Sequence, residues 1–131
     1  GVVDGVYNPR ADVTMGTGVR LRRKYKFQNE IGGKTGTTQN NSDGWFMGIT
    51  PNLVTGVWSG NEDRSIHFRT TFFGQGANMA LPIWAEYMDR VYKDTTTLGV
   101  YPEKFDIPQS IDLISDCGSK DAGTISYEEE F

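Results

Sequence analysis

The sequence is poor in the features that mark several large classes of protein. Its 131 residues contain one cysteine, Cys117, so no disulfide can form within the chain, and cysteine usage identifies no redox compartment. It contains no apolar run long enough to span a membrane and no secretion or lipid-attachment signal. Hydrophobic residues make up only 37% of the sequence, and the chain opens at Gly1 without a methionine. Both features favour a piece of a larger protein that packs against something outside itself.

Positive charge is also scarce overall, because 17 acidic residues outnumber 13 basic ones and the net charge is -4. This balance argues against a nucleic-acid partner, which normally meets a clustered basic surface. The charge is nevertheless uneven, since acidic residues dominate the end of the chain. Basic residues gather early, at Arg20, Arg22, Arg23, Lys24, Lys26 and Lys34. They form either a solvated basic face or a surface that attracts anions.

The pattern of apolar residues and turn formers predicts an α+β fold. Residues 30–38, 44–49 and 53–60 are rich in extended-chain signals and are separated by short polar turns, which predicts a three-stranded antiparallel meander. Apolar residues at helical spacing over 78–93 predict a helix that packs on this sheet, with Pro82 tolerated in its first turn. A short helix is favoured within 16–27, and 61–76 is expected to be a long loop, of a length that is often functional or covers a site.

Three segments follow from this pattern. Residues 1–15 are expected to be irregular, because they carry turn signals at Gly5, Asn8-Pro9 and Asp12. Residues 16–94 form the folded portion. Residues 95–131 carry few apolar residues and end in three glutamates, which is typical of a linker and an acidic tail without regular structure.

The strand around Lys34-Thr35-Gly36-Thr37-Thr38 looks like part of a site rather than of a core. It combines one cation with hydroxyl groups, and Gly36 allows another backbone to come close. Lys34, Gly36 and Thr38 should share one face of the strand, and Thr35 and Thr37 the other. An exposed edge of this kind can pair with an extended peptide that ends in a carboxylate. An N–H such as that of Thr37 could also donate to a developing oxyanion.

Several sequence blocks around this strand together resemble one family. They are Lys34-Thr35-Gly36-Thr37-Thr38, Asp43 with Trp45-Phe46 and Gly48, Leu53-Val54-Thr55-Gly56-Val57-Trp58, and Gly76-Ala77 with Ala80, Pro82-Ile83-Trp84 and Met88. From about Met15 to Tyr92, the chain is similar to the C-terminal part of the transpeptidase domain of class A penicillin-binding proteins, whose superfamily carries a Lys-Thr-Gly element. Gly16-Thr17-Gly18 resembles the glycine-threonine turn ahead of that strand, whereas residues 7–14 match nothing in the family.

The resemblance implies a function and a set of site residues. It implies a serine acyl-transferase that cross-links peptidoglycan stem peptides ending in D-alanine and is acylated by β-lactams. Such a protein is anchored in the bacterial cytoplasmic membrane, with this domain in the periplasm or outside the cell. By position, Lys34 would supply positive charge, the hydroxyls of Thr35 and Thr37 would bind the substrate carboxylate, and the Thr37 N–H would line the oxyanion hole. Gly36 and Thr38 complete the substrate-binding strand. Separately, no cluster of cysteine, histidine and aspartate has metal-ligand spacing, and no cofactor is expected.

The nucleophile that this family requires is missing from the sequence. The mechanism needs a serine followed three residues later by a lysine, and no Ser-x-x-Lys occurs in the chain. Ser59-Gly60-Asn61 matches the family's Ser-x-Asn element in composition but lies downstream of the lysine strand, so we interpret it as a strand end followed by a turn. His67 has no identifiable partner and is expected to be an ordinary loop residue. The chain alone is therefore expected to be inactive and to lack the upstream half of its domain.

Two alternatives remain open from the sequence. One is a non-catalytic module that binds peptide or peptidoglycan through the edge strand 34–38. The other is a fragment that self-associates through its exposed sheet, because an uncovered sheet edge can pair with a second copy.

Overall fold

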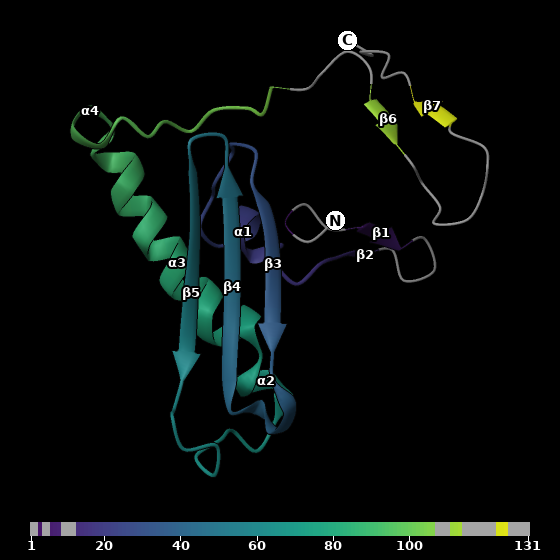
Figure 1. Ribbon diagram of the computed structural model, residues 1–131, viewed down its shortest axis with the longest axis vertical. Helices are drawn as coiled ribbons and strands as arrows, with labels where there is room; N and C mark the ends of the chain where they lie inside the picture. Colours follow the sequence, from purple (N-terminus) through teal and green to yellow (C-terminus); the bar gives the residue numbers. More distant parts are fainter. Residues whose placement is uncertain (1–2, 4–5, 9–12, 107–110, 114–122, 126–131) are drawn as a thin grey trace.

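The computed structural model describes residues 3, 6–8, 13–106, 111–113 and 123–125. Its centre is a three-stranded antiparallel sheet in the order β3-β4-β5, formed by β3 (Gly32–Thr37), β4 (Asp43–Thr50) and β5 (Leu53–Gly60). Figure 1 shows the long helix α3 (Gly76–Lys93) running behind these strands. The predicted α+β meander packed by one helix is confirmed.

Strand β4 shows why one face of the sheet is buried and the other is open. From Gly44 to Thr50 its residues alternate between buried and exposed, with Phe46 fully buried and Trp45 and Met47 exposed. On the buried side, Gly44 and Gly48 leave room for α3, because a Cβ atom at Gly44 would lie 2.9 Å from the Cα of Gly76. A Cβ atom at Gly48 would overlap the Trp84 ring.

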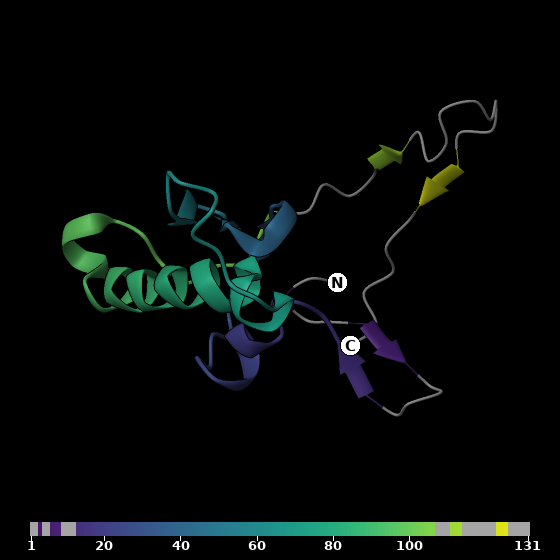
Figure 2. The ribbon, with the colours of Figure 1, turned by 90° about the horizontal axis from the view of Figure 1, so that it is seen from below.

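The core lies between this sheet face and α3. Trp84 is fully buried, packs edge to face against Phe46 and Phe27, and donates from Nε1 to the hydroxyl oxygen of Thr55 at 2.6 Å. The short helix α1 (Arg20–Arg23) adds Leu21 to the same core. In Figure 2, which looks along the strands, α3 lies between the sheet and α1. The short helix favoured within 16–27 is therefore confirmed.

Helix α3 begins earlier than the sequence pattern predicts. It starts at Gly76, so Pro82 lies in its second turn rather than its first. Pro82 has no N–H and cannot donate to the carbonyl of Asn78, which would be its partner four residues back. The early start is stabilised from outside the helix, because the N–H of Gly76 donates to the hydroxyl oxygen of Thr37 at 3.1 Å.

The segments predicted to lack regular structure contain short elements. The N-terminal segment has a two-stranded ladder of β1 (Val6–Asn8) and β2 (Val13–Met15), so the expectation of an irregular segment is wrong for these residues. The predicted loop over 61–76 contains the one-turn helix α2 (Thr71–Gly74). The predicted tail contains helix α4 (Thr95–Leu98) and a ladder of β6 (Ile111–Leu113) and β7 (Gly123–Ile125). A 3₁₀ turn, η1 (Gln39–Asn41), connects β3 to β4. Cys117 lies outside the described residues.

Candidate functional site

The candidate site is the open edge of β3. Strand β4 pairs with one edge of β3, and no strand within the described part of the chain pairs with the other. Lys34 and Thr37 are exposed, and Thr35, Gly36 and Thr38 are half-buried. The five predicted site residues therefore lie together along one accessible edge.

One hydrogen bond shows which residues of β3 point their N–H and C=O groups toward the open edge. The N–H of Thr38 donates to the carbonyl oxygen of Asp43 at 3.2 Å and so points toward β4. In an antiparallel strand, successive residues point their N–H and C=O groups to opposite sides. The N–H and C=O groups of Thr35 and Thr37 therefore point away from β4, toward the open edge.

The side chain of Lys34 reaches this same edge. Its ammonium group donates to the carbonyl oxygen of Thr35 at 2.6 Å. A positive charge thus lies beside a free backbone edge, which is the arrangement that suits an extended peptide ending in an anionic group.

The threonine hydroxyls are tied to elements on the α3 side of the sheet. Thr35 Oγ1 lies 3.4 Å from Thr17 Oγ1, and Thr37 Oγ1 accepts the N–H of Gly76. A Cβ atom at Gly36 would instead approach the Cβ of Trp45, on the exposed face of the sheet. The predicted alternation of Thr37 and Gly36 between the two faces is confirmed.

Thr38 holds the turn that leads from β3 into β4. Its hydroxyl lies 3.1 Å from the Ser42 hydroxyl and accepts the N–H of Asp43 at 3.2 Å. The Thr38 hydroxyl, followed by the Trp58 indole and the charge of Arg64, lowers the pKa of the Asp43 carboxyl, although desolvation opposes them. Asp43 is therefore a carboxylate at neutral pH and helps fix the end of the strand.

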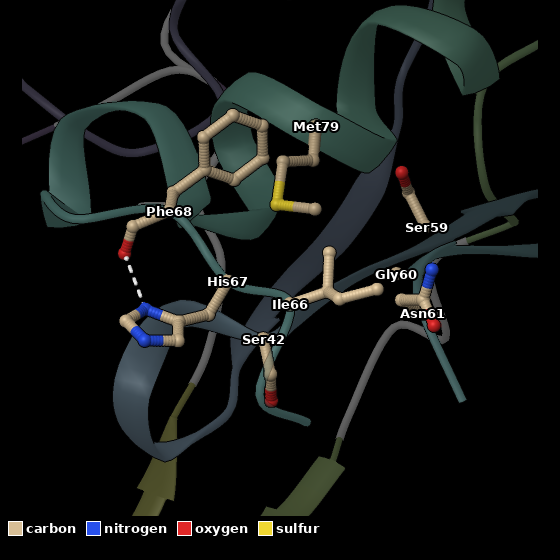
Figure 3. A pocket seen from close by; sticks show the side chains of 8 residues that line it. All are labelled: Ser42, Ser59, Gly60, Asn61, Ile66, His67, Phe68 and Met79. Atoms are coloured by element: carbon tan, nitrogen blue, oxygen red, sulfur yellow. Dashed lines mark hydrogen bonds between the residues drawn. The ribbon is translucent and has the colours of Figure 1, made fainter. Parts of the chain in front are cut away.

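The Ser-x-Asn string and the lone histidine lie away from this edge. Ser59 and Asn61 flank the end of β5 at Gly60, which agrees with the interpretation as a strand end. They line a hollow of about 300 Å³ together with His67 and Met79 (Figure 3). His67 is exposed, and its Nδ1 lies 3.1 Å from the carbonyl oxygen of Phe68. No hydrogen bond joins Ser59, Asn61 or His67 to residues 34–38 in the part of the chain that the structure describes.

The structure adds residues that the motif alone did not identify. Gly76 contacts the site closely, because a Cβ atom there would overlap the carbonyl oxygens of both Gly36 and Trp45. The sequence signal for this contact is Gly76 in the Gly76-Ala77 block, which belongs to the family resemblance. A second addition is a hollow of about 640 Å³ lined by Gly16, Thr17, Val19, Arg20, Arg23, Gln75 and Ala77.

Among the described residues, no three histidine, cysteine, aspartate or glutamate side chains cluster as metal ligands. In the same residues, no helix combines the length and the apolar character needed to cross a membrane.

Comparison with known proteins gives a consistent set of relatives. No protein-family model matches the chain. It is 36% identical over 104 residues to penicillin-binding protein 1A of Rickettsia conorii and 38% identical over 100 residues to that of Aquifex aeolicus. These alignments cover 79% and 76% of the chain and 12% of each relative. The chain therefore spans about an eighth of the length of these curated relatives.

A solved structure agrees with the sequence relatives. The fold is similar to the crystal structure of penicillin-binding protein 1A from Haemophilus influenzae, with a TM-score of 0.57 and 27% sequence identity. The likeness covers 84% of this chain and 15% of that one.

Proposed function

Since this chain belongs to the penicillin-binding protein 1A family, we propose that residues 16–94 form the C-terminal, substrate-binding part of a D,D-transpeptidase domain. The observation that carries this proposal is the open edge of β3, where the Lys34 ammonium and the outward backbone groups of Thr35 and Thr37 lie together. The nucleophile belongs to another part of the same protein, because the chain contains no Ser-x-x-Lys.

In this proposal, β3 holds a D-alanine-terminated stem peptide as an added strand. The peptide backbone pairs with Thr35 and Thr37, and its terminal carboxylate lies near Lys34 and the threonine hydroxyls. The N–H of Thr37 then donates to the oxyanion that forms when the serine attacks the peptide carbonyl. A β-lactam occupies the same edge, with its carboxylate and carbonyl in the corresponding places.

The exposed face of the sheet indicates where the rest of the transpeptidase domain packs. Large apolar side chains that α3 does not cover lie on this face: Trp45, Met47, Ile49, Val54 and Trp58. The aliphatic stem of Lys34 leaves the strand on this side, since Lys34 alternates with Thr35. Contiguous exposed apolar surface of this kind marks an interaction site. We assign the remaining part of the transpeptidase domain, including its serine, to this face. That domain then acts outside the cytoplasmic membrane, where peptidoglycan is cross-linked.

The first prediction is that the isolated chain forms no covalent adduct with penicillin. Acylation needs the activated serine, which the chain lacks. Incubation with a fluorescent penicillin followed by a denaturing gel should give no labelled band, whereas a full-length relative handled in parallel should be labelled. A stable band on the isolated chain would show that a nucleophile lies within these residues and would contradict the proposed division of the site.

The second prediction concerns non-covalent binding by the same edge. A peptide ending in D-alanyl-D-alanine should perturb the backbone amide signals of Thr35 and Thr37 at millimolar concentration, because one wall of a site binds weakly. Lys34→Met should weaken binding about twofold to fivefold, since an exposed charge contributes about 0.4–1 kcal/mol. Lys93→Met is the matched control, because Lys93 lies at the far end of α3 and should leave the affinity unchanged.

The outcomes of this titration separate the alternatives. Saturation at micromolar concentration would favour an autonomous peptide-binding module instead. Amide shifts that depend on protein concentration without peptide would favour self-association through the sheet. Equal affinities for the Lys34→Met and Lys93→Met variants would remove Lys34 from the site.

A further inference from the structure

The second hollow, which lies beside β3, is lined by residues that have no role in the proposed binding of the peptide to β3. Its lining includes Thr17, two arginines and Gln75, and its volume is about 640 Å³. It opens on the α3 side of the sheet, whereas the side chain of Lys34 belongs to the opposite side. It is therefore a separate place from the Lys34 edge, although it adjoins it.

Two contacts connect the hollow to the open edge. Thr17 lines the hollow, and its Oγ1 atom lies 3.4 Å from the Oγ1 atom of Thr35. Gln75 and Ala77 also line the hollow and flank Gly76, whose N–H donates to Thr37 Oγ1. A peptide paired with β3 therefore has this hollow beside it, and alternate side chains of an added strand point to that side.

The arginines of α1 have different surroundings. Arg22 is used within the fold, because its Nη1 donates to the carbonyl oxygens of Phe27 at 3.0 Å and Asn29 at 2.6 Å. The guanidinium groups of Arg20 and Arg23 have no hydrogen bond or ion pair with any residue that the structure describes. Arg20 is half-buried and Arg23 is exposed at the hollow.

The segment that carries these arginines contains only positive charges. No acidic residue occurs between Val13 and Asn29, whereas five basic ones do. Guanidinium groups pair most strongly with carboxylates, and hydroxyl and amide groups such as those of Thr17 and Gln75 add hydrogen bonds to such an anion. The hollow thus combines charge, donors and space for an acidic group.

We infer that this hollow, through Arg20 and Arg23, binds a carboxylate carried by a side chain of the peptide that pairs with β3. The inference rests on the proposed function for the position of the peptide and deepens it by assigning a preference for an acidic residue upstream of the D-alanyl-D-alanine end. It concerns recognition and leaves the acyl-transfer chemistry unchanged.

The test compares two tetrapeptides, acetyl-Glu-Lys-D-Ala-D-Ala and acetyl-Gln-Lys-D-Ala-D-Ala, titrated against the whole chain and followed by backbone amide shifts. The acidic peptide should bind the unchanged chain about threefold to tenfold more tightly. This advantage should disappear in the double variant Arg20→Gln/Arg23→Gln. It should persist in Arg69→Gln/Arg90→Gln, which removes two exposed charges that do not line the hollow. Unshifted amide signals of the core residues Phe46 and Trp84, which are fully buried and distant from the substituted positions in the sequence, confirm that the variants remain folded.

Free glutarate and its neutral diamide provide a second arm that does not depend on β3 pairing. Glutarate should shift the amides of Thr17 and Gln75, and the shifts should be lost in Arg20→Gln/Arg23→Gln. Equal binding of the two tetrapeptides, or an acidic advantage that survives that double variant, would overturn the inference. If neither tetrapeptide binds while glutarate still shifts these amides in an arginine-dependent way, the proposed peptide edge fails and the carboxylate site stands.

Discussion

Replacing Trp84 by alanine should destabilise the fold more than any other single change considered for this chain. The side chain is fully buried, packs against Phe27 and Phe46, and donates a hydrogen bond to Thr55. Removing a buried aromatic side chain costs about 3–5 kcal/mol. That is a large part of the roughly 5–15 kcal/mol by which domains are normally stable. The loss leaves a cavity against Gly48, which has no side chain to fill it.

Urea unfolding followed by circular dichroism measures this effect. Trp58→Ala is the matched control, because it removes the same side chain from the exposed face of the sheet, where 43% of Trp58 is accessible. That change should cost about 1 kcal/mol or less. Trp84→Phe should fall between the two, since it keeps an aromatic ring but loses the hydrogen bond to Thr55. Similar losses for Trp84→Ala and Trp58→Ala would mean that α3 does not seal the core as described.

The second large effect is expected from Gly76→Ala. Helix propensity alone would favour alanine by up to about 1 kcal/mol. Sterics oppose it, because the added methyl group would overlap the backbone carbonyl oxygens of Gly36 and Trp45. Overpacking against atoms that cannot rotate away costs about 1–3 kcal/mol or more, so the net change should be a loss of about 2 kcal/mol.

The same substitution should also disturb the candidate site. The start of α3 would have to move away from β3, which lengthens the hydrogen bond between Gly76 N–H and Thr37 Oγ1. The measurement combines urea unfolding with the amide shifts of Thr37 and Gly44. Gly32→Ala is the control, because its added Cβ would meet only Ile49 atoms, the nearest at 3.6 Å. An unchanged Thr37 signal together with unchanged stability would contradict the close contact between helix and sheet.

The central fold could be predicted because its signals are local. Strand signals separated by the short turns around Asn40 and Pro51 were sufficient to place β3, β4 and β5. The direction in which β4 faces could not be predicted, because Trp45, Met47 and Ile49 on one side are as apolar as Phe46 on the other. The buried side is instead marked by Gly44 and Gly48, whose lack of a side chain matters only once α3 is in place.

Longer-range contacts account for what the sequence pattern missed. The start of α3 at Gly76 depends on Thr37, which is 39 residues away in the chain. The ladder between Val6–Asn8 and Val13–Met15 could not be predicted, because three-residue strands are too short to show alternation. The Lys34–Thr38 motif was visible, and its roles in binding and catalysis remain predictions. The arrangement of Arg20 and Arg23 around a hollow depends on how α1 lies against α3.

The order of elements in the central layer has a consequence for how the chain reaches its structure. Strands β3, β4 and β5 follow one another in sequence, and each strand pairs with its neighbour along the chain across a short turn. Turns this short close with little entropy loss, and sheets built from such near-neighbour contacts form fast. The sheet that carries Lys34 can therefore fold early in a longer polypeptide. Its exposed apolar face is then available for segments distant in the sequence to pack against.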